Sequence, residues 1–324
     1  MKSASHSFAR RQVLGILAVS ALLPGGIATK SFAAENKAGE GPYLFSYFKD
    51  NGQDGLHLAY STDGLTWKSL NGDKPLTSPA VGGKLMRDPS IVQGPDGVFH
   101  MVWSSGWADR GFGYASSKDL VHWGEHRYIP VNEKIAGANN TWAPDMFYDA
   151  ASKQFVMVFA TTILGRFPET DKEGDQNHRQ YAVTTKDFVT FSEPFLFFNP
   201  GYNCIDGTLF ATDQGLSFIY KDERIKGKRL HLVTSAGLGK PWSEPGKPIL
   251  ERDWVEGPTV LRVGSVWRLY FDQYTRHRYG AAESKDGIHW EDISDKVTFP
   301  DGARHGTAFS VSSSVLEALL KLGK

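Results

Sequence analysis

Short apolar stretches that alternate with polar positions recur along most of the chain. They cover residues 43–48, 99–104, 155–161, 216–220 and 266–273. Alternation with a period of two residues is typical of β-strands. Convincing helical spacing occurs only near the end, over residues 313–322. The pattern therefore predicts an all-β fold with one short C-terminal helix.

A hairpin motif of the form Ser/Thr-x-Asp-x-x-x-aromatic occurs four times. The copies span residues 61–67, 117–123, 185–191 and 284–290, and a degenerate fifth copy ends at Trp242. The closing aromatic residues lie 56, 68, 51 and 48 residues apart, about the length of a four-stranded sheet with its turns. The Asp can fix the turn while the aromatic residue packs against a neighbouring sheet. Five copies predict a five-bladed β-propeller.

A second series of motifs, out of phase with the hairpins, marks the start of the inner strand of each blade. It consists of Arg87-Asp88-Pro89, Trp142-Ala143-Pro144-Asp145, Ile205-Asp206-Gly207, Val255-Glu256-Gly257-Pro258 and Arg304-His305-Gly306. Too little chain follows the fifth motif to finish a blade, so we expect the N-terminal strands at residues 43–67 to join that blade and close the ring. The prediction is a single domain over residues 35–324, without a linker.

The second blade contains an insertion around residues 164–179. It is polar and predicts a loop over one rim of the ring. Its residues Arg166, His178 and Arg179 are expected to be solvated surface residues, so they are not among the candidate site residues.

Composition excludes several classes of protein. The 36 Lys and Arg residues are balanced by 36 Asp and Glu residues, which leaves no broad positive field for binding nucleic acid. The single cysteine, Cys204, allows no intrachain disulfide and no Cys-rich metal site, and is expected to be a small buried side chain.

The first 34 residues differ in character from the rest of the chain. Arg10 and Arg11 precede an apolar run at residues 13–23, and small residues follow at positions 31–34. This run is too short for a transmembrane helix and is typical of a cleavable export signal. The paired arginines favour the twin-arginine route of bacteria. We therefore expect a periplasmic or secreted protein with no membrane anchor after cleavage.

The second series also predicts a site, because the first residues of the inner strands of a propeller meet at one end of its central channel. The five side chains expected there are Asp88, Asp145, Asp206, Glu256 and His305. Four carboxyl groups around one cavity raise some of their pKa values, which is costly unless the arrangement has a function. Two carboxyl groups of different pKa, one protonated and one ionised, suit the hydrolysis of a glycosidic bond.

The ordered motifs resemble the blade starts of glycoside hydrolase family 43, over about residues 43–309. That family contains five-bladed, inverting α-L-arabinofuranosidases, β-xylosidases and arabinanases. The resemblance implies that Asp88 is the general base, Glu256 the general acid, and Asp206 the carboxylate that raises the pKa of the acid and orients it. It also implies that Asp145 is a sugar-binding or supporting group.

The first motif also fits another clan of five-bladed enzymes. Arg87 precedes Asp88 where many members of family 43 have a different residue, and Arg-Asp-Pro occurs in retaining, sucrose-active enzymes. Those enzymes also carry an Asn-Asp-Pro motif, which is absent between residues 43 and 67. The inverting mechanism is therefore favoured.

The acidic candidates also have ordinary structural interpretations. Asp88 before Pro and Asp206 before Gly are common turn residues, and their shared phase with Glu256 is what favours a catalytic role. Glu256 itself starts an apolar run, where a charged residue is awkward without a partner or a task.

The other candidates are predicted to bind substrate. Trp107 and Trp142 are either core residues or platforms for a sugar ring, and Arg87 is placed with them as a binding residue. His305 either packs in the core or faces the channel, where it could hold a water or a water-coordinated Ca²⁺ or Na⁺ ion. No carboxylate spacing resembles a calcium loop, so the cation is an optional structural addition.

We therefore expect a monomeric, exported exo-glycosidase that needs no cofactor and releases terminal sugars, most simply α-L-arabinofuranose, from oligo- or polysaccharides. A β-xylosidase or a galactofuranosidase with the same site is the alternative. A non-catalytic carbohydrate-binding propeller is the alternative from another class, and the presence of all three acids argues against it.

Overall fold

The alternating stretches form strands that pair into five antiparallel sheets in the computed structural model, which describes residues 41–171, 176–224 and 226–322. These residues belong to the unit Ala34–Lys324. The predicted export signal at residues 1–34 lies outside the described residues. Within the described ranges, no helix is long and apolar enough to cross a membrane.

Each sheet is one blade, and we number the blades from the Arg87 motif onward. Blade 1 contains β4 (Arg87–Gln93), β5 (Phe99–Ser104), β6 (Phe112–Ser117) and β7 (Arg127–Ile129). Blade 2 contains β8 (Trp142–Asp149), β9 (Gln154–Thr161), β10 (Arg179–Thr185) and β11 (Phe195–Phe198). Blade 3 contains β12 (Cys204–Thr212), β13 (Gly215–Asp222) and β14 (Arg229–Ser235). Blade 4 contains β15 (Glu256–Val263), β16 (Val266–Gln273), β17 (Arg278–Ser284) and β18 (Glu291–Asp292).

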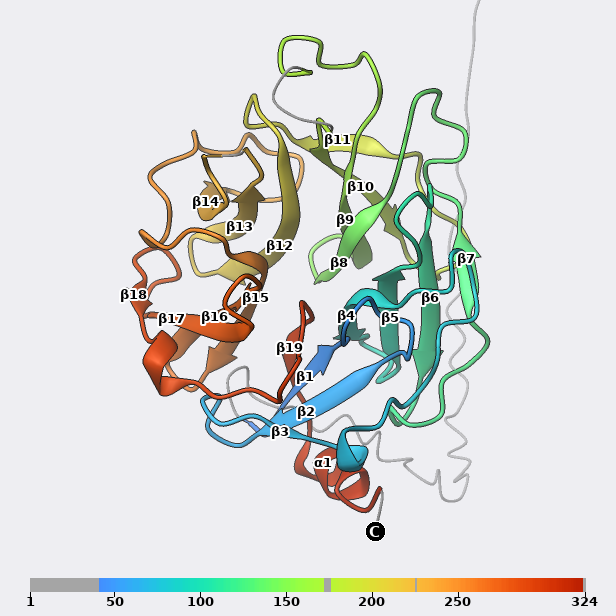
Figure 1. Cartoon of the computed structure of the whole chain (residues 1–324), viewed down its shortest axis with the longest axis vertical. Coiled ribbons are helices and arrows are strands. Elements are labelled where there is room, and N and C mark those ends of the chain that lie inside the picture. Colours follow the sequence, from blue (N-terminus) through green and yellow to red (C-terminus); the bar gives the residue numbers. More distant parts are fainter. Residues whose placement is uncertain (1–40, 172–175, 225, 323–324) are drawn as a thin grey trace, which may run out of the picture. The chain divides into compact units, whose positions relative to one another are not determined.

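Blade 5 is built from both ends of the described chain. It contains β19 (Ala308–Ser310) followed by β1 (Tyr43–Tyr47), β2 (His57–Ser61) and β3 (Lys68–Ser69). β19 and β1 are antiparallel, with Ala308 opposite Phe45. The five sheets surround a common centre, with β4, β8, β12, β15 and β19 nearest to it (Figure 1). The predicted five-bladed propeller and its closure by the N-terminal strands are confirmed.

The repeated hairpins owe their shape to two local acceptors. In the copy at residues 117–123, the Ser117 hydroxyl accepts hydrogen bonds from the backbone N–H groups of Asp119 and Leu120. The Asp119 carboxylate accepts those of Val121 and His122. The same four bonds recur in the other three full copies. The motif therefore fixes a turn, as predicted.

Blade 3 has three strands, although the repeat length predicts four. Its degenerate hairpin has Gly237 where the other copies have Asp, and Pro245 and Pro248 follow it. Proline has no N–H group to donate to a neighbouring strand, so this segment cannot form a regular ladder. It bonds to β14 through the N–H groups of Ser243 and Ile249.

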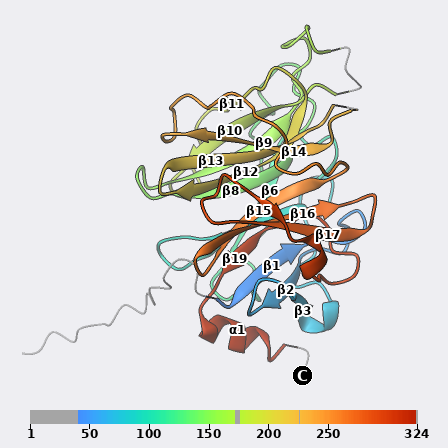
Figure 2. The same cartoon turned by 90° about the vertical axis from the view of Figure 1, so that its left-hand side faces the viewer.

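The predicted C-terminal helix is α1 (Ser313–Leu319), which is three residues shorter than expected. Its first turn is capped by the Ser312 hydroxyl, which accepts the backbone N–H of Val315. Leu316 and Leu319 are buried in a cluster that includes Leu70. Figure 2 shows α1 beside β1, β2 and β3. Two short 3₁₀ helices, η1 (Asn71–Asp73) and η2 (Ser294–Lys296), complete the described elements.

The insertion of blade 2 connects β9 to β10. Arg166 in it is exposed, as expected, but His178 and Arg179 are buried, so the expectation of solvated side chains was wrong for these two. The backbone N–H of His178 bonds to Asn203, and the Arg179 guanidinium bonds to Asn199. Arg179 also donates hydrogen bonds to Thr170 and Asn177 within the insertion. Buried polar groups are stable where they have such partners.

Candidate active site

Four of the five inner strands contain a β-bulge near their start. In β4, Arg87 pairs with Ser104 and Ser90 pairs with Val102, so one additional residue is accommodated between the two pairs. The second residue, Asp88, adopts the left-handed conformation, with φ of 53°. The same register shift occurs in β8, β12 and β15. The equivalent left-handed residues are Ala143, Asp206 and Gly257, with φ of 46°, 52° and 58°.

Gly257 is required in blade 4 because of its neighbour. The equivalent residues of the other blades adopt a similar positive φ with a side chain, but a Cβ at position 257 would lie 2.4 Å from Cγ of His305. No carboxylate can therefore occupy the position that is equivalent to Asp88 and Asp206. The acid of this blade, Glu256, comes one residue earlier.

The bulge also separates Asp145 from the other acids. Ala143 occupies the position equivalent to Asp88, whereas Asp145 is equivalent to Ser90, further along its strand. Asp145 is not among the residues that line the pocket. Its carboxylate accepts a hydrogen bond from the Ser90 hydroxyl at 2.9 Å, and burial raises its pKa to about 6.

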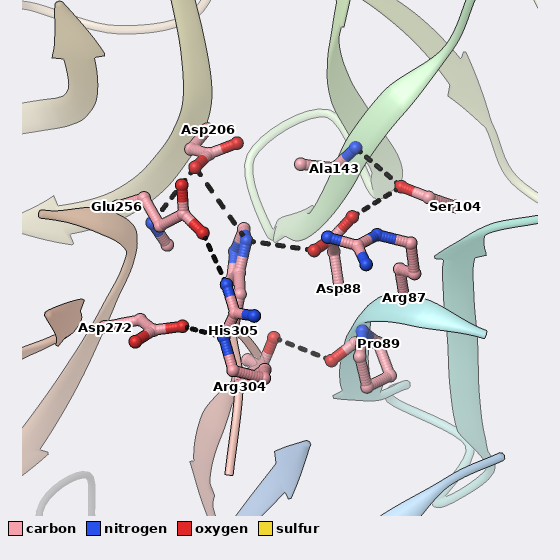
Figure 3. A network of polar contacts seen from close by, with 12 residues as sticks. Arg87, Asp88, Pro89, Ser104, Ala143, Asp206, Glu256, Asp272, Arg304 and His305 are labelled. Carbon is pink, nitrogen blue, oxygen red and sulfur yellow. Dashed lines mark hydrogen bonds and ion pairs between the residues drawn. The ribbon is translucent and has the colours of Figure 1, made fainter. Parts of the chain in front are cut away.

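The other predicted acids lie together with His305 around a pocket of about 400 Å³ (Figure 3). Three blades contribute one acid each: Asp88 from blade 1, Asp206 from blade 3 and Glu256 from blade 4. His305 approaches from the segment before β19. Of the predicted binding residues, Arg87, Trp107 and Trp142 also line the pocket.

Asp88 is held ionised at the pocket wall. Its Oδ2 accepts a hydrogen bond from the Ser104 hydroxyl at 2.7 Å, and its Oδ1 lies 3.3 Å from Nδ1 of His305. Burial alone would raise the pKa of Asp88, but the hydrogen bond and charge of His305, the charge of Arg87 and the bond from Ser104 lower it to about 2. Asp88 is therefore a carboxylate at any ordinary pH.

His305 is the matching cation. Burial lowers the pKa of this imidazole, but the nearby carboxylates Asp88, Asp206 and Glu256 outweigh burial and raise it to about 9. Its Nδ1 lies 4.0 Å from Oδ2 of Asp206, so one ring nitrogen faces two acids. Of the two interpretations of His305, the structure supports the one that faces the centre.

The pKa of Asp206 is shifted in the opposite direction to that of Asp88. Its Oδ2 accepts the backbone N–H of Gly257 at 3.1 Å. Burial raises the pKa of Asp206, the charge of Glu256 raises it further, and the result is about 6 although His305 and Lys221 act in the other direction. Asp206 can therefore carry a proton in mildly acidic solution.

Glu256 forms ion pairs with two cations. Its Oε2 lies 2.9 Å from Nζ of Lys221, and its Oε1 accepts a hydrogen bond from Arg304 at 2.9 Å. Burial would raise the pKa of Glu256, but Lys221, Arg304 and His305 together lower it. This differs from the expectation that Asp206 leaves the acid with a raised pKa.

Aromatic side chains and a stacked arginine line the pocket next to Asp88. The guanidinium of Arg87 lies 4.3 Å from the ring centre of Trp107 and 4.6 Å from that of Phe48. Trp107 is 52% exposed, and its ring meets that of Trp142 edge to face at 5.5 Å. The exposed indole of Trp107 and the partly buried indole of Trp142 lie beside polar groups, and such rings are suited to contact the apolar face of a sugar.

Several groups of the site are not predicted by the motifs. Arg304 lies in the fifth motif without an assigned role, and Ser104, Lys221 and Asp272 lie in middle strands. These three pair with the residues that directly precede the bulges of inner strands: Arg87 with Ser104, Ile205 with Lys221, and Glu256 with Asp272. Pairing each inner strand with the next strand of its blade, and reading the residue opposite the motif, would have found them.

The cation expected near His305 stays a prediction. In the part of the chain that the structure describes, no group of three or more His, Cys, Asp and Glu side chains is arranged to hold a metal ion. His305 directs Nδ1 toward Asp88 and Asp206. Its positive charge opposes a second cation at that nitrogen.

Taken together, the pocket combines an ionised carboxylate, Asp88, with two acids, Asp206 and Glu256, that contact different partners. A carboxylate can activate water, and a protonated carboxyl group can assist a leaving oxygen. These are the groups that hydrolysis of a glycosidic bond by general acid and base catalysis needs.

Comparisons with known proteins point to the same chemistry. Residues 40–317 match the model of a family related to glycoside hydrolase family 43 and described as a probable glycosyl hydrolase domain. An α-L-arabinofuranosidase of Bifidobacterium longum subsp. longum is 28% identical over 282 residues. The match covers 74% of this chain and 25% of that protein, so the chain spans about a quarter of the length of this curated relative.

Solved structures show the same fold. An α-L-arabinofuranosidase from Lactobacillus brevis has a TM-score of 0.52 and 19% identity, over 64% of this chain and 72% of that chain. The catalytic domain of a GH62 α-L-arabinofuranosidase from Coprinopsis cinerea has a TM-score of 0.52 and 17% identity, over 69% of this chain and 77% of that chain.

Proposed function

The chain belongs to this family of glycosyl hydrolase domains related to family 43 and is a glycoside hydrolase, and from that premise we propose that it releases terminal α-L-arabinofuranose from oligo- or polysaccharides. The observation that supports the proposal best is the convergence of Asp88, Asp206 and Glu256 on one pocket of about 400 Å³. The sugar is suggested by the relative named as an α-L-arabinofuranosidase.

In the proposed mechanism, Asp88 removes a proton from a water molecule as that water attacks the anomeric carbon. Glu256 gives a proton to the glycosidic oxygen, so the bond between this oxygen and the anomeric carbon breaks while the bond to water forms. One proton enters Asp88 and one leaves Glu256, which balances the step without a cofactor. Direct attack by water inverts the configuration at the anomeric carbon.

The remaining residues bind and position the sugar in this proposal. Trp107 and Trp142 stack against its apolar face, and Arg87 donates hydrogen bonds to its hydroxyl groups from the same wall. Asp206 is the carboxylate that tunes the acid, because it is buried beside Glu256 and interacts with it electrostatically. Asp145 supports the inner strands from outside the pocket, through Ser90.

A panel of nitrophenyl glycosides tests the activity and the sugar together. It contains α-L-arabinofuranoside, β-D-galactofuranoside and β-D-xylopyranoside, and proton NMR records the first anomer released. We expect turnover of the arabinofuranoside with inversion. Release of the same anomer as in the substrate would exclude the proposed mechanism, and sugar binding without release from any glycoside would favour a carbohydrate-binding propeller.

We also propose that residues 1–34 direct export by the twin-arginine route, because Arg10 and Arg11 precede a short apolar run. Replacing both arginines by lysine keeps the charge and removes the signal. We expect the double variant to stay in the bacterial cytoplasm while the native chain is found outside it, as measured by cell fractionation. Equal export of both would exclude this route.

A further inference from the structure

Lys221 is a buried lysine beside the acid. It lies in β13, opposite Ile205, and only 2% of its side chain is exposed. Its Nζ lies 2.9 Å from Oε2 of Glu256 and 2.8 Å from Oε2 of Glu223. Burial opposes its charge, but these acids raise the pKa of Lys221, so it is a cation.

The lysine completes a ring of charges around Glu256. Arg304 donates a hydrogen bond to the other oxygen of Glu256 and also pairs with Asp272, at 2.6 Å. Further charged or titratable groups also act on Glu256 or on Lys221. They are Asp206 of β12, Tyr274 after β16, Tyr279 of β17, His178 before β10, and His305 before β19. Arg304 shares its charge with Asp272, and Lys221 shares its charge with Glu223.

An acid catalyst must be protonated to act, and a cation in contact with its carboxylate opposes protonation. We propose that Lys221 is a positioning residue that holds one oxygen of Glu256 and thereby limits how readily this acid takes up its catalytic proton. The inference deepens the proposed function, since it concerns the acid of that reaction. It predicts that removing Lys221 makes Glu256 easier to protonate, although it also removes a contact.

The pH dependence of the reaction separates this role from a merely structural one. The alkaline limb of kcat/KM reports the acid of the free enzyme, because the rate falls as that acid loses its proton. In Lys221→Met we expect this limb to move to higher pH by about 1 unit or more, the size of shift that an adjacent opposite charge produces. Lys221→Arg keeps the charge and restores the native limb.

Lys228 provides the matched control. It also contacts Glu223, but no contact with Glu256 is described. Lys228→Met therefore removes a neighbouring lysine and leaves the ion pair between Lys221 and Glu256 intact. We expect its alkaline limb to stay within about 0.3 pH unit of the native one.

A second measurement does not depend on turnover. The side-chain carboxyl carbons of glutamate are labelled with ¹³C, and Glu256→Gln identifies the resonance of Glu256. We expect its titration midpoint to rise by about 1 unit or more in Lys221→Met and in Lys221→Gln, and to stay unchanged in Lys228→Met. Lys221→Gln retains a polar group facing Glu223, and provides the test if Lys221→Met does not fold.

The two measurements can fail separately. If the native protein hydrolyses no glycoside of the panel, the proposed function fails, and the resonance of Glu256 still decides the inference. If the native protein is active but neither the limb nor the titration midpoint moves in a folded Lys221 variant, the role assigned to Lys221 is wrong.

Discussion

Burial alone does not determine the ionisation of the acids in this protein. Asp88 and Asp206 occupy equivalent positions in two blades. Burial by itself would raise the pKa of both. Asp88 contacts His305 and Ser104, which lower its pKa to about 2. Asp206 has only a distant contact with His305 and is repelled by Glu256, so its pKa is about 6. The neighbouring groups therefore decide which of these two carboxyl groups stays ionised in mildly acidic solution.

Replacing Asp88 by Asn tests this assignment. The amide cannot accept a proton from water, so we expect kcat/KM to fall about 100-fold or more while the melting temperature changes little. The rate of nitrophenol release from the nitrophenyl glycoside is the measurement. Asp213→Asn, at an exposed position in the turn after β12, is the matched control and should keep native activity. Native rates in Asp88→Asn would remove Asp88 from the mechanism.

Asp145 provides a prediction for the pH dependence of stability. Burial raises its pKa from 3.8 to about 6. Between these values the unfolded chain releases the proton that the folded protein keeps, so the contribution of Asp145 to stability falls as the pH rises, and the loss is complete above pH 6. We expect Asp145→Asn to raise the melting temperature by a few degrees at pH 8 and not at pH 4.

Melting curves of both proteins at pH 4 and pH 8 provide the measurement for Asp145. Asp213→Asn controls for the loss of one negative charge on the folded protein. An equal effect of Asp145→Asn at both pH values would show that Asp145 does not titrate as its burial implies.

At the scale of single elements, local chemistry was predictable and distant contacts were not. The Ser/Thr-x-Asp hairpins were predictable because all four bonds lie within seven residues, as in the turn from Ser117 to Trp123. The burial of Arg179 was not, because its partners Thr170, Asn177 and Asn199 lie in loops whose conformation no motif specifies. Lys221 belongs to no motif, and its contact with Glu256, 35 residues away, can be anticipated only by pairing β13 with the Ile205 motif.

Asp119→Ala tests the contribution of one hairpin. The change removes the acceptor of two backbone N–H groups in a turn that the Ser/Thr-x-Asp motif specifies. We expect the free energy of unfolding to fall by about 1 to 2 kcal/mol, with unchanged specific activity. Urea denaturation provides the measurement. Lys118→Ala, in the same turn, should have no effect, and an equal loss in both variants would show that the Asp bonds are not the cause.

For the whole molecule, the ring is held together where blade 5 meets blade 1. The Ser46 hydroxyl is fully buried, donates a hydrogen bond to the carbonyl of Pro89 at 2.6 Å and accepts the N–H of Thr307 at 3.0 Å. One side chain thus joins β1, β4 and the segment before β19. The count of five blades was predictable from the repeat, but this junction was not, because no motif marks Ser46.

Ser46→Ala should weaken the closure. It leaves a buried carbonyl and a buried N–H without this partner, so we expect the free energy of unfolding to fall by about 1 to 3 kcal/mol in urea denaturation. Ser69→Ala, in the outer strand β3 of the same blade, is the control. A loss no larger than that of the control would show that other contacts hold the ring.

The closure of the ring by β1 and β19 also has a consequence for the acids. Arg304 and His305, which touch Glu256 and Asp88, lie in the segment that leads into β19, the strand that pairs with β1. These two cations lower the pKa values of the acids that they touch. A change that disrupts the pairing of β1 with β19 is therefore expected to alter the ionisation of both acids, although neither belongs to blade 5.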